Sequence, residues 1–63
     1  MKRKALLREL ASIGKSKNLE LKLVRHGSGH DFYQLGEAVL IVGRHTDIPE
    51  YTAKITLKTA RNA

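Results

Sequence analysis

The spacing of apolar residues changes twice along this chain, and this change limits the folds that the chain can adopt. Residues 4–13 carry leucine and isoleucine at helical spacing, whereas residues 19–42 form three short runs with strand character. After Pro49, which suits the first position of a helix, the apolar residues again permit a helical stripe. The sequence therefore predicts an α+β domain with the order α-β-β-β-α.

The two helices are predicted over residues 3–14 and 49–60. Gly14 is placed to end the first of them as a C-cap. The last helix has a competing interpretation, because its threonines are poor helix formers and residues 51–57 also alternate as a strand would. A fourth strand in place of this helix is the alternative that the spacing leaves open.

Short turns containing glycine separate the three strands, which predicts an antiparallel three-stranded sheet with both helices on one face. The second strand alternates between two faces, with His30, Phe32 and Gln34 on one and Asp31, Tyr33 and Leu35 on the other. If the helices cover the second of these faces, Phe32 lies beside His30 on the open side. The predicted core consists of Leu6, Leu10, Ile13, Leu21, Leu23, Tyr33, Leu35, Val39, Ile41, Ile55 and Leu57.

The chain is a single predicted domain of 63 residues, with no cysteine and a formal net charge of +6. So small a core gives marginal stability without a partner, and no disulfide can add to it. The positive charge favours a polyanion such as nucleic acid, or an acidic protein, although it can also serve solubility alone. No apolar run approaches the ~20 residues of a membrane span, so we expect a cytoplasmic protein.

His30 is the candidate catalytic residue, because an imidazole can both accept and donate a proton near neutral pH. RNA carries its own nucleophile, the 2′-hydroxyl, so its cleavage needs proton transfer and charge stabilisation but no metal. The three histidines do not have the spacing of metal ligands, and neither a metal nor another cofactor is predicted. A histidine at the edge of a strand is, however, more often structural or simply exposed.

The residues expected to contact RNA surround His30 in the sequence. Cations would hold phosphates, glycines would let backbone N–H groups approach them, and Phe32 would stack on a base. His45 can be the complementary acid, an RNA contact or an ordinary loop residue, and His26 is interpreted as a turn residue. The predicted RNA-binding set is Lys22, Arg25, Gly27, Gly29, Phe32, Arg44 and His45.

Two short motifs give the chain a resemblance to a known family. The first, residues 27–33, is a glycine-rich turn that delivers a histidine before aromatic residues, and the second is Arg44-His45-Thr46-Asp47-Ile48. With the basic start of the chain and a last helix that carries Ala53-Lys54-Ile55, they make it resemble the HicA family of toxin ribonucleases. The family's order of elements, similar to that of double-stranded-RNA-binding domains, agrees with the pattern above.

The resemblance implies a metal-independent endoribonuclease of a type II toxin–antitoxin pair, which cleaves mRNA with His30 in the catalytic position. It also implies an antitoxin of the HicB type as the partner. Gly43 stands where many relatives have proline before the second basic-His pair, and this puts a role for His45 in doubt. Two other functions stay open: a non-catalytic RNA-binding module, and a small basic domain that binds an acidic protein.

Overall fold

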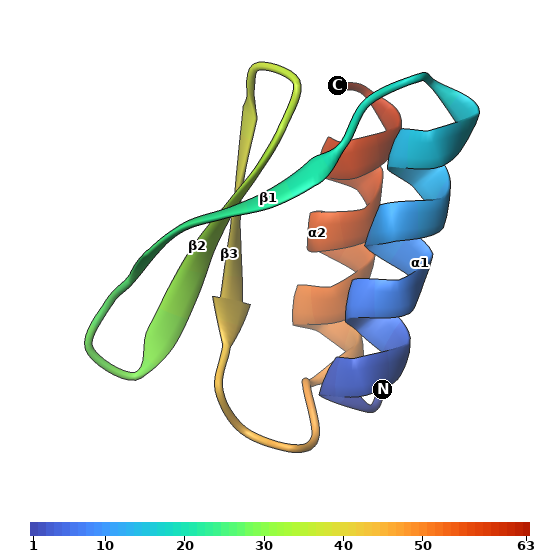
Figure 1. Ribbon diagram of the computed structural model, residues 1–63. Coiled ribbons are helices and arrows are strands. Elements are labelled where there is room, and N and C mark those ends of the chain that lie inside the picture. The colour runs from blue at the N-terminus through green and yellow to red at the C-terminus, as the bar shows by residue number, and fades with distance from the viewer.

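Two helices lie on one side of a three-stranded antiparallel sheet in the computed structural model, which describes all 63 residues (Figure 1). The order α-β-β-β-α is as predicted, and the last segment is a helix rather than a fourth strand. Neither helix is long and apolar enough to cross a membrane. The elements in chain order are α1 (Arg3–Ser16), β1 (Leu21–His26), β2 (His30–Leu35), β3 (Ala38–Gly43) and α2 (Glu50–Arg61).

The helix α2 forms despite its threonines because its inward face is buried against the core, and two of the three threonine hydroxyls bond within the helix. The Thr56 hydroxyl donates to the Thr52 carbonyl at 3.0 Å, and the Thr59 hydroxyl donates to the Ile55 carbonyl at the same distance. The inward face of α2 carries small and apolar residues at spacings of three and four, which only a helix can place together. These buried residues are Ala53, Thr56, Leu57 and Ala60.

The core lies between the helices and the sheet face that they cover. Leu35 of β2 and Leu40 and Val42 of β3 point to this face, and all three side chains are almost completely buried. Leu6 and Leu10 of α1 close this layer from the helix side. We call this side of the sheet the helix-covered face and the other side the open face.

Four predicted core residues are exposed, with exposed fractions near one half. Val39 and Ile41 lie on the open face, because Val39 pairs with Gln34 and Ile41 with Phe32. Leu23 is exposed because β1 runs away from the helices along its length, as Figure 1 shows. Ile55 lines an open groove between α2 and β3 and so stays half exposed. The core instead uses Leu40, Val42, Ile48, Ala53 and Ala60, which were not predicted.

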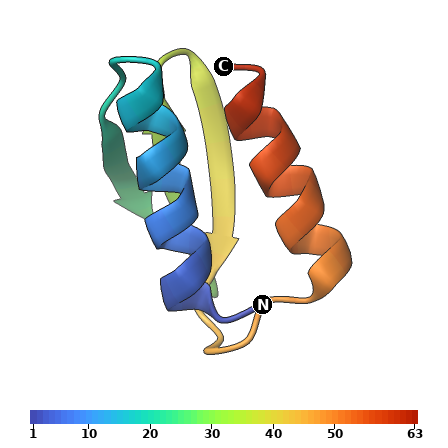
Figure 2. The same cartoon turned by 90° about the vertical axis from the view of Figure 1, so that its right-hand side faces the viewer.

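The first residues of the chain hold the loop between β3 and α2. The Met1 amino group donates to the Ile48 carbonyl at 2.9 Å, and the Ile48 N–H donates back to the Met1 carbonyl at 2.7 Å. The Arg3 N–H donates to the Thr46 carbonyl at 2.8 Å. Figure 2 shows this start of α1 beside the loop at one end of the molecule. The loop that follows Arg44 and His45 is therefore fixed by backbone bonds.

Candidate functional site

The two basic-His segments of the sequence meet at one end of the sheet, where β2 begins and β3 ends. His30 pairs with Gly43 across the two strands. The Arg44 N–H donates to the Gly29 carbonyl at 3.3 Å, which continues this contact beyond the strands. Residues that are about fifteen positions apart in the sequence are therefore neighbours in space.

His30 lies on the open face, where its ring contacts Phe32. The two rings meet edge to face, with centroids 5.3 Å apart and planes at 62°. The Arg25 guanidinium lies over the same Phe32 ring, with its central carbon 4.5 Å from the centroid. The Arg25 side chain is exposed and makes no hydrogen bond within the chain, so its N–H donors remain available to an anion.

A β-bulge places Arg25 on the open face. Leu23 pairs with Tyr33, but the next pair is Arg25 with Phe32, so Val24 is the extra residue. Strict alternation after Lys22 would have put Arg25 on the helix-covered face. With the bulge, Lys22 and Arg25 share the open face with His30, as their predicted role in phosphate binding requires.

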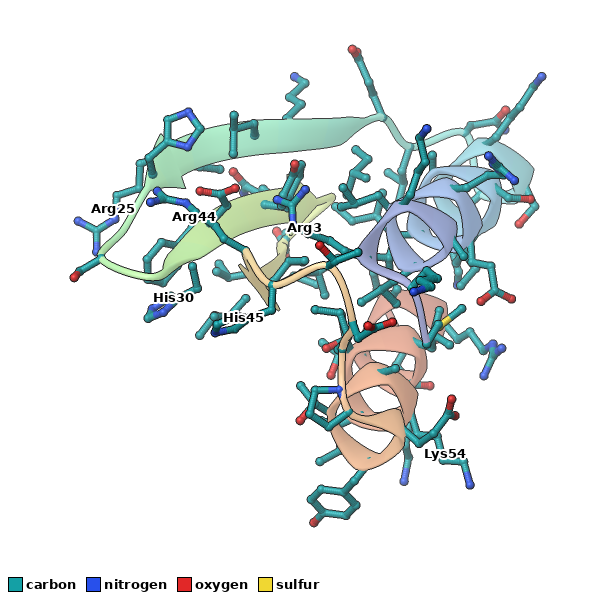
Figure 3. All side chains as sticks on the ribbon, turned by 90° about the horizontal axis from the view of Figure 1, so that it is seen from below. Arg3, Arg25, His30, Arg44, His45 and Lys54 are labelled. Carbon is teal, nitrogen blue, oxygen red and sulfur yellow. The ribbon has the colours of Figure 1, made fainter.

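The cations of the predicted set do not all lie near His30. Lys22 pairs with Gln34, four residues along β2 from His30, which corresponds to about 13 Å of strand. Lys22 would therefore contact a different phosphate from the one beside His30. Arg44 lies on the opposite side of β2 from His30, whereas His45 lies on the same side as His30 (Figure 3). Arg25 is thus the cation of the set that shares the immediate surroundings of His30.

The two glycines of the predicted set shape the turn between β1 and β2. The Gly27 N–H donates to the His30 carbonyl at 2.8 Å, so it is engaged and not free for a phosphate. A Cβ at Gly27 would come within 2.7 Å of the Phe32 ring, so any larger residue there would displace that ring. Gly29 adopts a φ of +81°, a conformation that other residues rarely adopt. The Gly29 N–H has no partner within the chain and stays available to a ligand.

Asp31, which was not among the predicted site residues, is the centre of a charged cluster. Its side chain is only 7% exposed and lies on the helix-covered face. One oxygen accepts hydrogen bonds from His26 Nδ1 at 2.8 Å and Arg44 Nε at 2.9 Å, and the other accepts from an Arg3 amino group at 2.8 Å. We call these four residues the Asp31 cluster. The sequence did contain an indication of this cluster: the alternation of β2 places Asp31 on the face predicted to be covered by the helices, and a buried carboxylate needs hydrogen-bond partners.

The pKa of Asp31 lies below its ordinary value of 3.8. The hydrogen bond from His26 lowers this pKa most, and Arg44 lowers it further through its hydrogen bond and its charge. Burial opposes these effects, because it disfavours the charged form. Asp31 is therefore ionised at neutral pH, and as an acceptor it requires that His26 Nδ1 carries the hydrogen.

Other surface features lie around this end of the molecule. A cleft of about 450 Å³ on the side of Arg44 is lined by Lys2, Arg3, Lys4, Leu7, Arg44 and Thr46. Lys2 there pairs with Asp47 at 2.9 Å, whereas Lys4 makes no ion pair. A shallow apolar groove of about 320 Å³ separates β3 from α2 and borders Ile41 of the open face.

The chain brings no group of three or more histidine, aspartate or glutamate side chains into a metal-binding arrangement. Comparison with protein-family models, with curated proteins and with solved structures found no match for this chain.

Proposed function

We propose that this chain is a metal-independent endoribonuclease that cleaves mRNA, the toxin of a HicA-type toxin–antitoxin pair. The observation that carries the proposal is the arrangement of Arg25, Phe32 and His30 on the open face. An imidazole lies there beside an arginine whose donors have no partner in the chain, in a protein with a formal net charge of +6. The resemblance of the two sequence motifs to that family supports the same assignment.

In the proposed reaction, His30 accepts the proton of the RNA 2′-hydroxyl, and the resulting oxygen attacks the adjacent phosphorus. The bond from phosphorus to the 5′-oxygen then breaks, leaving a 2′,3′-cyclic phosphate on one product. The Arg25 guanidinium is placed to stabilise the additional negative charge on the phosphate during this step. One proton-transfer group of this kind contributes typically about 10²–10⁴-fold to the rate.

The leaving 5′-oxygen must gain a proton, and His45 is the candidate donor. Its side chain is exposed and lies on the same side of β2 as His30 (Figure 3). The backbone contact between Arg44 and Gly29 brings the two segments together. Two imidazoles on one surface can supply the base and the acid that the reaction needs.

Base stacking in this site involves Arg25 as well as Phe32. The guanidinium already covers one face of the Phe32 ring. A base can stack on the outer face of this guanidinium, which is a common way to bind single-stranded RNA. We therefore propose that the Phe32 ring supports the Arg25 guanidinium and that this guanidinium contacts RNA.

The test compares His30→Ala with the unchanged protein on a single-stranded RNA substrate. We expect the variant to lose cleavage, to keep its melting temperature and to retain much of its RNA affinity, because the cations position the backbone. EDTA should leave the cleavage rate of the unchanged protein the same. Wild-type cleavage by purified His30→Ala protein would refute the assignment, and RNA binding without cleavage by either protein would favour a non-catalytic RNA-binding module.

A further inference from the structure

Asp31 occupies an unusual position for an acidic residue in so small a protein. It is the one aspartate or glutamate that the fold buries, and a buried carboxylate destabilises a protein unless cations and hydrogen bonds compensate it. Its partners come from the start of α1, the end of β1 and the residue after β3. A single side chain thus joins all the segments that surround the candidate site.

The geometry of the strands connects this cluster to the two histidines. Asp31 directly follows His30 in β2, and Arg44 directly precedes His45. Adjacent residues of a strand such as β2 point to opposite sides, and Figure 3 shows Arg44 and His45, in the bend after β3, on opposite sides of β2 as well. The ion pair between Asp31 and Arg44, at 2.9 Å, therefore joins the two segments on one side while the imidazoles lie on the other.

Arg3 makes further contacts with the end of β3 and with Asp31. The Arg3 Nε donates to the Gly43 carbonyl at 2.8 Å, while an amino group of the same guanidinium donates to Asp31. Gly43 is the residue that pairs with His30 across the sheet. Arg3 therefore ties the backbone before Arg44 to the carboxylate that follows His30.

We infer that Asp31 is a positioning residue, which sets the placement of His30 relative to His45 by holding Arg44 and Arg3 behind the sheet. This inference rests on the proposed function, in which the two imidazoles act as base and acid. Asp31 does not touch RNA in this arrangement, because its oxygens face the protein cations and it is buried. Its contribution is to the rate of the chemical step, not to binding.

The charge of Asp31 makes the inference testable. Asp31→Asn removes one negative charge and raises the formal net charge from +6 to +7, which strengthens electrostatic attraction to RNA. A loss of positioning instead lowers the cleavage rate of bound substrate, and a displacement of about 1 Å can cost on the order of 100-fold. Rate and affinity are therefore expected to change in opposite directions.

The matched control is Asp47→Asn. Asp47 is an exposed aspartate on the loop after His45, paired with Lys2 at 2.9 Å, and its replacement gives the same change in net charge. Single-turnover cleavage, RNA affinity at fixed salt and melting are measured for both variants. For Asp31→Asn we expect a rate reduced about 10-fold or more, with affinity unchanged or tighter. For Asp47→Asn we expect a rate within about twofold of the unchanged protein.

A second variant and a second readout keep the outcomes distinct. If Asp31→Asn does not fold, Arg44→Lys keeps the charge, removes the Nε contact and should show the same loss of rate. NMR signals of the His30 and His45 rings should shift in folded Asp31→Asn protein and stay unchanged in Asp47→Asn protein. If the unchanged protein does not cleave RNA, the proposed function fails, and the ring signals alone decide the placement of the histidines.

The inference is overturned if folded Asp31→Asn protein has wild-type ring signals, or if it cleaves at the wild-type rate while the wild type itself is active. It is also overturned if rate and affinity fall together with the melting temperature, since that pattern indicates a purely structural role. Where only Arg44→Lys folds, a wild-type rate and wild-type ring signals contradict the inference in the same way.

Discussion

The face of the sheet that Arg25 occupies depends on its neighbour Val24, which has no proposed role in RNA binding. Val24 is the extra residue of the β1 bulge, and its presence changes which face Arg25 occupies. On the open face the guanidinium gains the Phe32 ring as a support. A supported arginine loses less conformational freedom on binding, so in the proposed function the bulge would contribute indirectly to RNA affinity.

The first prediction concerns the phosphate contact of Arg25. Arg25→Ala should weaken binding of single-stranded RNA and reduce the slope of log affinity against log salt by about 0.7, the value for one phosphate contact. Lys54→Ala is the matched control, because Lys54 is an exposed cation on α2, away from the labelled site residues in Figure 3. Salt titrations of RNA affinity measure both slopes. Equal slopes for the two variants would show that Arg25 does not contact an RNA phosphate.

The elements were predictable from the sequence wherever their periodicity was unambiguous. The stripe of α1 and the alternation along β2 place Leu6, Leu10 and Leu35 in the core, as predicted. In β3, five consecutive apolar residues have no alternation, so the sequence did not indicate which of them face the helices. The register of β3 against β2 decides this, and it places Leu40 and Val42 inward.

The candidate site was predictable to a similar extent. His30 and Phe32 were expected on one open face, and the alternation of β2 was sufficient for that. The bulge at Val24 and the hydrogen bond from Gly27 to His30 depend on tertiary pairing, which no local pattern encodes. The Asp31 cluster joins residues up to 41 positions apart (Arg3 to Arg44), so only the fold brings them together.

The second prediction tests the faces of β3. Leu40→Ala should lower the free energy of unfolding by about 2–5 kcal/mol, because Leu40 is 2% exposed and its truncation leaves a cavity. Ile41→Ala should cost less than about 1 kcal/mol, because Ile41 is 53% exposed. Urea denaturation of the two variants measures both values. A larger cost at Ile41 than at Leu40 would contradict the register.

At the scale of the whole molecule, the protein combines a small core with a surface that exposes both cations and apolar side chains. Only twelve of its 63 residues are buried, so its stability is expected to be small. Its open face exposes the apolar side chains of Val39 and Ile41 beside a basic site. A face of this kind suits a partner that carries acidic groups and covers apolar area at the same time.

The third prediction is that an acidic antitoxin of the HicB type, as the proposed function implies, binds the open face and protects both the fold and the site. Binding to the folded chain alone raises its apparent stability by mass action, by about 2.7 kcal/mol at a concentration of partner 100 times the Kd. Melting curves with and without the partner measure this, and cleavage assays should show inhibition over the same concentration range. Ile41→Ala should weaken the effect, whereas Lys54→Ala, on the exposed side of α2, should not. If saturating partner leaves the melting temperature unchanged, the open face is not a protein-binding surface, and its exposed apolar residues are then left to contact the bases of RNA.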